Sequence, residues 1–169
     1  MQELLDQILE SAEHGAIGEQ LGISADDAKN GLGALLPALT GATQAKVREE
    51  GGLGMIVDAI SGGSFERLAP DAGGSVEEAA TEGEGILQGF LDGGMIDSVT
   101  SKVSETTGLD PSTIKKLLPV AASMLMGFLA KRGKEGAAEE GGGGIGDVLG
   151  GMLDKDGDGS FLDDVMGGA

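Results

Sequence analysis

The sequence contains no cysteine, tryptophan or tyrosine, and four phenylalanines are its only large aromatic residues. The lack of cysteine excludes disulfide bonds and thiolate zinc sites. Because aromatic side chains are so few, the core must be built from Leu, Ile, Val, Met and Ala, which bury less apolar surface each, at about 25 cal/mol per Å². We therefore expect helices that approach closely, and a marginal stability that a metal or an oligomer would support.

Positive charge is also scarce, because 11 basic residues stand against 29 acidic ones and give a net charge of −18. Such a balance argues against nucleic acid, whose phosphates are bound by Lys and Arg, and against anionic membrane surfaces. It attracts cations and keeps a protein soluble. A high-salt cell interior is an alternative explanation, but much of the acid is concentrated in particular places, which favours cation binding.

No segment has the pattern of a secretory signal or a membrane span. The beginning, MQELLDQILESAEHG, lacks a basic head and an apolar run. The longest apolar stretch runs from Leu117 to Ala130, is shorter than the roughly 20 residues that a spanning helix needs, and contains Pro119. We expect a cytoplasmic protein without a membrane partner, with export by another route left open.

Glycine is abundant, with 33 residues, and it separates short apolar segments. Two of these segments, residues 21–41 and 107–127, align without a gap at an offset of 86 residues. Gly22 then matches Gly108, Leu32 matches Leu118 and Gly41 matches Gly127. Conserved apolar and turn positions of this kind predict two copies of one helix-turn-helix unit.

In each copy a polar residue precedes an apolar helix. Ser24 and Asp110 stand where an N-cap belongs, Asp27 suits the capping box, and Pro111 suits the first helical position. The spacing of the apolar residues is helical in both copies. These residues are Ala28, Leu32, Leu35, Leu36 and Leu39, and then Ile114, Leu117, Leu118, Ala121, Ala122 and Leu125. Pro37 and Pro119 predict a kink or an interruption in each helix.

The predicted class is all-α, because no segment alternates as a strand does. We predict a duplicated helical-hairpin bundle with a Gly-rich linker and a C-terminal tail like a calcium loop. The expected divisions are a first helical repeat over 1–60 that includes a helix around 53–60, a flexible connector over 61–84, a second repeat over 85–132, a Gly/Glu linker over 133–144, and a short helix with an Asp-rich loop over 145–169.

The stretch DKDGDGSFLDD, residues 154–164, predicts a calcium site. Calcium takes six to eight oxygen ligands, and its helix-loop-helix sites place acids at loop positions one, three and five and glycine at six. Here the expected ligands are Asp154, Asp156, Asp158, the carbonyl of Ser160, and Asp163 or Asp164. The usual Glu at position twelve is replaced by Val165, so we expect an altered exit from the loop and weak affinity. The alternative is a solvated acidic turn.

Three other features have simple structural explanations. His14, the only histidine, could act as a base but lacks an accompanying nucleophile, so a surface or inter-helix turn is expected. The glycines in EEGGGGIG lack the Lys-Ser/Thr of a phosphate-binding loop and indicate a linker. Residues 101–118 have the layout of a helix-turn-helix DNA reader with Lys115 and Lys116 early in its second helix. The equivalent residues of the first copy, Lys29 and Asn30, lie among acids, so nucleic-acid binding is the weaker hypothesis.

The two turns LGIS and TGLD, each followed by an apolar helix with LLP, and the terminal GGMLDKDGDGSFLDDVMGG resemble the uncharacterised bacterial proteins grouped as domain of unknown function 937, which are similar to the YidB-like proteins. The resemblance extends over nearly the whole chain and is most specific in GGMLDKDGDGS. It implies an all-helical bacterial protein and supplies no catalytic residues. We expect a non-enzymatic calcium-binding protein that self-associates into an oligomer or polymer, with a helix-turn-helix regulatory protein as the alternative.

Overall fold

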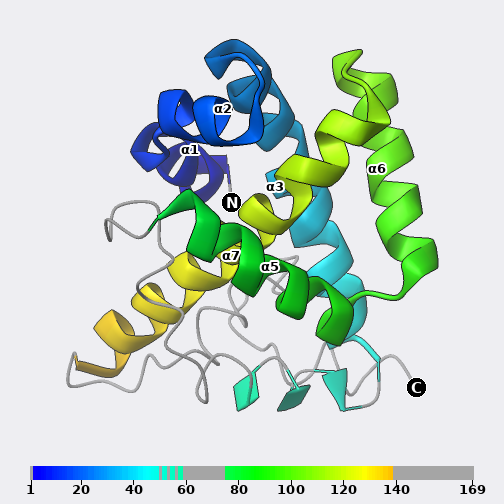
Figure 1. The fold of residues 1–169 in the computed structure, drawn as a ribbon. Coiled ribbons are helices and arrows are strands. Elements are labelled where there is room, and N and C mark those ends of the chain that lie inside the picture. Colours follow the sequence, from blue (N-terminus) through cyan, green and yellow to red (C-terminus); the bar gives the residue numbers. More distant parts are fainter. Residues whose placement is uncertain (1, 50, 53, 56, 59–74, 139–169) are drawn as a thin grey trace.

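The computed structural model describes residues 2–49, 51–52, 54–55, 57–58 and 75–138, and every element with bounds in these ranges is an α-helix (Figure 1). The helices are α1 (Gln2–Ser11), α2 (His14–Leu21), α3 (Ala25–Val47), α5 (Val76–Phe90), α6 (Gly93–Thr107) and α7 (Pro111–Ala138). The prediction of an all-α fold is confirmed for this part of the chain.

Helix α7 is the centre of the fold and packs against α1, α3, α5 and α6. In Figure 1 α7 runs through the middle, with α5 crossing in front of it, α3 behind it and α6 at one side. Every residue from Leu117 to Gly127 is buried. By length and composition, the 21 residues Pro111–Lys131 could cross a membrane, but 78% of the 18-residue apolar window within them is buried inside the protein. An apolar helix covered on all sides is the expected core of a helical bundle.

The turns before α3 and α7 begin alike. Gly22 and Gly108 both take the left-handed conformation, with φ of 70° and 73°, that glycine adopts without steric cost. Ser24 then accepts a hydrogen bond from the amide of Asp27 at 3.0 Å, which confirms it as the N-cap of α3. Pro111 is the first residue of α7, as predicted. Turn chemistry in the sequence therefore fixes where the two longest helices start.

Helices α5 and α7 cross with their backbones in contact. A Cβ atom added to Gly83 of α5 would lie 1.8 Å from the carbonyl oxygen of Pro119 in α7. A Cβ on Gly31 of α3 would meet the Leu117 side chain of α7, again at a helix crossing. The lack of aromatic residues predicted helices that approach closely, and these two crossings show such close approach.

Neither internal proline interrupts its helix. The sequence predicted a kink or an interruption at each proline. α3 runs through Pro37 over 23 residues and α7 runs through Pro119 over 28 residues, so of these two alternatives the interruption is wrong. A proline has a φ compatible with a helix and removes one backbone hydrogen bond. Burial of Pro119 at the crossing with α5 offsets that loss.

Two predicted loop segments are helical where the structure describes them. α5 begins at Val76, inside the expected connector 61–84, because Ser75 caps it through the amide of Glu78 at 3.1 Å and its Ala79, Ile86 and Leu87 are buried. α7 continues to Ala138, into the expected linker 133–144. Gly52, Gly54, Met55, Val57 and Asp58 are helical, in agreement with the helix predicted around 53–60.

The buried hydroxyl groups are satisfied within their own helices. Thr40 donates to the carbonyl of Leu36 at 2.8 Å, and Ser123 donates to the carbonyl of Val120 at 3.0 Å. Such bonds to the preceding turn remove the penalty of an unpaired buried polar group. Met124 and Met126 are buried in the same apolar cluster as Leu125 and Leu129. The core is therefore mainly apolar, and these two buried hydroxyl groups find hydrogen-bond acceptors within their own helices.

Candidate functional site

The predicted calcium loop lies outside the described residues. The structure therefore does not place Asp154, Asp156, Asp158, Ser160, Asp163 or Asp164, and the calcium site stays a prediction. Within the described ranges, no three His, Cys, Asp or Glu side chains are grouped so that they could hold a metal ion. Candidate sites in the helical part must therefore be sought among grooves and cavities.

One candidate in the described part of the chain is a groove between α3 and α6, which we call the α3–α6 groove, with a volume of about 780 Å³. From α3 it is lined by Ala34, Pro37, Ala38, Gly41 and Ala42, and from α6 by Gly94, Met95, Ser98, Val99 and Lys102, with Asp92 at the turn before α6. The spacing on each helix is three, four and seven residues, which places each set on one face. The two sets thus form opposite walls of a single open channel.

The α3 wall of the α3–α6 groove is made of small residues, and Asp92 and Lys102 place opposite charges toward its two ends. Pro37 and Gly41 are exposed, and Ala34 and Ala38 are only partly covered. Asp92 stands at one end of α6, where its Oδ1 accepts a hydrogen bond from the amide of Met95 at 2.9 Å as the N-cap. Lys102 is exposed nearer the other end. A shallow apolar channel with a charge at each end is suited to a helix rather than to a compact polar ligand.

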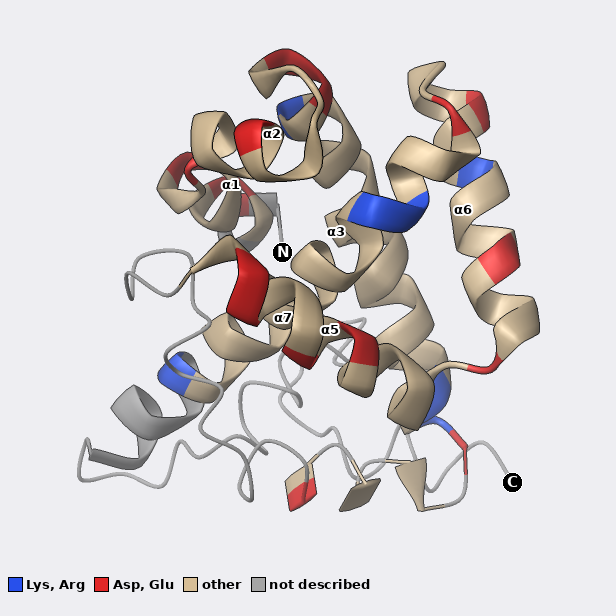
Figure 2. Ribbon diagram, in the orientation of Figure 1, with Lys and Arg blue, Asp and Glu red and all other residues tan. Residues whose placement is uncertain are grey.

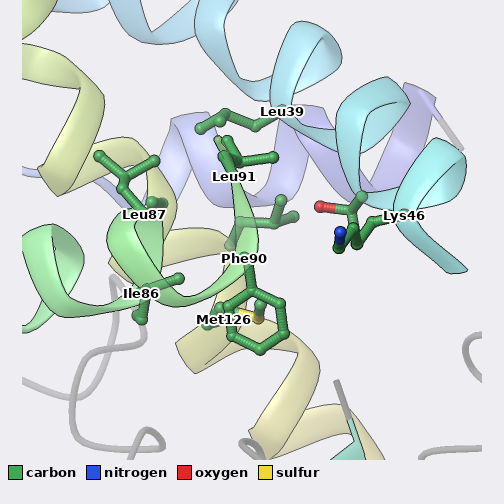
Figure 3. A pocket seen from close by; sticks show the side chains of 10 residues that line it. Leu39, Lys46, Ile86, Leu87, Phe90, Leu91 and Met126 are labelled. Carbon is green, nitrogen blue, oxygen red and sulfur yellow. The ribbon is translucent and has the colours of Figure 1, made fainter. Parts of the chain in front are cut away.

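A second, much smaller cavity lies between α3, α5 and α7 (Figure 3). Its volume is about 20 Å³, and its lining is Leu39, Thr43, Lys46, Ile86, Leu87, Phe90, Leu91, Ala122, Leu125 and Met126. Figure 3 shows Phe90 and Met126 side by side, with Lys46 at the edge. Lys46 is paired with Glu49, with its Nζ 2.6 Å from Oε2. The space would admit about one water, which needs two to four polar partners, so we interpret it as a packing void.

His14 begins α2 directly after the break that follows α1, in agreement with the predicted inter-helix turn. Its Nε2 atom is buried and has no hydrogen-bond partner in the described part of the molecule. Burial lowers the pKa of His14 below the usual 6.5, and the positive charge of Lys29 lowers it further. The ring is therefore neutral at pH 7.

The two lysines of the hypothetical DNA-reading helix make contacts within the protein. Lys115 Nζ lies 3.5 Å from Asp97 Oδ1 of α6, and Lys116 Nζ donates to the carbonyl of Leu21 at the end of α2 at 3.4 Å. The neighbouring Ile114, Leu117 and Leu118 are buried. Figure 2 shows acidic positions on α1, α2, α5 and α6 around the molecule. Lys115 and Lys116 thus join α7 to the helices beside it.

The α3–α6 groove was not predicted from the amino-acid sequence. Its signal was present as small residues at helical spacing in α3 and as the set Met95, Ser98, Val99 and Lys102 in α6. Periodicity assigned α3 a buried face but could not show that the adjacent face would be left uncovered, because the distance between α3 and α6 depends on how both pack on α7.

Comparison with known proteins gives one match. A family model described as bacterial protein of unknown function, DUF937, matches residues 3–132. No curated protein and no solved structure matches the chain. The family match includes the described helices as far as Arg132 in α7 and ends before GGMLDKDGDGS, the stretch in which the resemblance was most specific. The chain belongs to the bacterial DUF937 family.

Proposed function

We propose that this protein is a non-enzymatic, calcium-binding protein that self-associates through the α3–α6 groove. The observation that carries the proposal is the groove itself, whose lining is largely apolar and includes the exposed Pro37 and Gly41 of α3. Helices normally bury their apolar faces against another element. A surface of small residues between two helices supports contact with a further helix, because small side chains let the backbones approach.

Calcium binding is the second half of the proposal and rests on the spacing of Asp154, Asp156 and Asp158 before Gly159. A bound cation would also reduce the repulsion between copies that each carry a net charge of −18. Calcium would then promote self-association in two ways, by ordering the loop and by lowering the net charge. A non-enzymatic role agrees with a sequence that has one histidine and no cysteine.

We further propose that the helical part arose by duplication. The support is that α3 and α7 begin at Ala25 and Pro111, which are separated by the same 86 residues as the aligned segments. Left-handed Gly22 and Gly108 precede them at equivalent positions. Upstream the copies differ, because α1 and α2 are separate helices whereas α6 is continuous.

The test is a calcium titration of metal-stripped protein by calorimetry, with particle size followed by light scattering. We expect heat of binding and a larger particle in calcium, and loss of both in the Asp156→Ala, Asp158→Ala double variant. Asp26→Ala with Asp27→Ala is the matched control, because it removes the same charge from the first turn of α3. An absence of heat at millimolar calcium contradicts calcium binding, and a monomer at high concentration with and without calcium contradicts self-association.

A further inference from the structure

The α3–α6 groove has an acidic end and a basic end, so it favours an occupant with the opposite charges in the matching order. Met95, Ser98, Val99 and Lys102 form one face of α6, and Asp92 and Lys102 are separated by ten residues along it. At 1.5 Å per residue, the Cα atoms of Asp92 and Lys102 are about 15 Å apart along the helix axis. A second helix that carried the opposite charges at the same spacing, in reverse order, would match both ends.

Helix α6 itself carries those charges when it is turned end to end. In an antiparallel pair related by a two-fold axis near Asp97, Lys102 of each copy faces Asp92 of the other. We propose that the α3–α6 groove receives α6 of a second copy of this chain, antiparallel, with two reciprocal pairs between Lys102 and Asp92. This inference rests on the proposed self-association and names its surface, partner and register.

The apolar centre of this arrangement is suited to close helix contact. Gly94, Ser98 and, across the groove, Ala38 and Gly41 have little or no side chain to separate the helices. Packed helix axes are 8–10 Å apart, and the radius of the Cα positions is about 2.3 Å, so facing Cα atoms come within roughly 4 to 5 Å of each other. A two-fold interface presents the same surface from both copies. Charge complementarity of this kind sets register more than it sets affinity.

Because the chain has no cysteine, single cysteines report on the register directly. Ser98 lines the groove close to the predicted two-fold axis, whereas Ser101 is an exposed residue of the same helix outside the lining. We expect Ser98→Cys to form a covalent dimer under mild oxidation at least about tenfold faster than Ser101→Cys, since a disulfide needs Cα atoms within about 4.4–6.8 Å.

A charge reversal tests the reciprocal pairs. Lys102→Glu places an acid opposite the partner's Asp92 in each of the two reciprocal pairs, so we expect the dissociation constant from sedimentation to rise roughly 2- to 30-fold. Lys29→Glu is the control, because Lys29 is exposed, lies outside the groove lining and gives the same change in net charge. Asp92→Asn keeps the N-cap, and adding it to Lys102→Glu should restore part of the affinity.

The outcomes separate the inference from the proposed function. Self-association with equal cross-linking of the two cysteine variants, or equal weakening by Lys102→Glu and Lys29→Glu, overturns the α6 pairing and leaves the proposed function standing. A monomer under all conditions overturns both. The protein could also stay monomeric while a thiol reagent labels the cysteine of Ser98→Cys more slowly than that of Ser101→Cys. That result would mean that another part of the same chain fills the groove, and it would also overturn the proposal.

Discussion

The contact between Gly83 and Pro119 predicts a large effect from the smallest possible substitution, Gly83→Ala. The added Cβ would lie 1.8 Å from the Pro119 oxygen, whereas ordinary contacts begin at 3.4 Å, so α5 and α7 must separate by about 1.6 Å. Overpacking usually costs about 1–3 kcal/mol, and we take the upper end because the opposing atoms are backbone. The higher helix propensity of alanine relative to glycine offsets about 1 kcal/mol of this cost. The expected net loss in the free energy of unfolding is about 2 kcal/mol.

Gly85→Ala in the same helix is the matched control, since nothing lies within 4 Å of its added Cβ. It should gain up to about 1 kcal/mol, which makes the expected difference between the two variants about 3 kcal/mol. Urea unfolding followed by circular dichroism at 222 nm measures both. For a chain of this size the difference corresponds to roughly 6–12 °C in Tm. Equal stability of the two variants would refute the close crossing of α5 and α7.

Three further predictions concern other parts of the molecule. Because folding lowers the pKa of His14 from 6.5, its contribution to stability is fully present above pH 6.5 and is lost as the pH falls through the folded pKa. His14→Gln should therefore flatten the stability profile just below pH 6.5, measured as the difference from the parent protein, and an unchanged profile would contradict the buried Nε2. Ser24→Ala should lower the free energy of unfolding by about 1 kcal/mol and Ser24→Asp should not, because aspartate also caps; equal urea midpoints would exclude the cap as a source of stability. Chelation of calcium should leave the helical signal at 222 nm of the described helices unchanged while particle size falls, and a loss of helix on chelation would mean that the metal supports the core.

Helix positions could be predicted from the sequence where local chemistry decides them. Ser24 and Pro111 predicted the first turns of α3 and α7, because caps and helix-starting prolines act within three or four residues. The apolar spacing after them identified the buried positions, including Leu32, Leu36 and Ile114. The prediction failed for the first part of α5, residues 76–84, whose Gly and acidic residues indicated a connector. The N-cap at Ser75 is local chemistry, but the burial of Ala79 that supports this turn comes from tertiary packing.

The candidate sites divide in the same way. The acidic spacing at Asp154, Asp156 and Asp158 is a local pattern, so the sequence alone supports the calcium hypothesis. The α3–α6 groove joins residues more than 50 positions apart, such as Ala38 and Met95, and no local pattern predicts their separation. The groove forms because α3 and α6 each pack on α7, and the positions that they take there decide how far apart their facing side chains lie.

By itself, the sequence determined the all-α class, the starts of α3 and α7 and a core without large aromatics, because capping, periodicity and composition act locally. Only the tertiary structure decided that the helix continues through Pro119, that Gly83 meets the carbonyl of Pro119, and that a groove remains where α3 and α6 pack side by side. The physical reason is that these features depend on contacts between segments far apart in the chain, whose free energy outweighs the local preferences of glycine and proline.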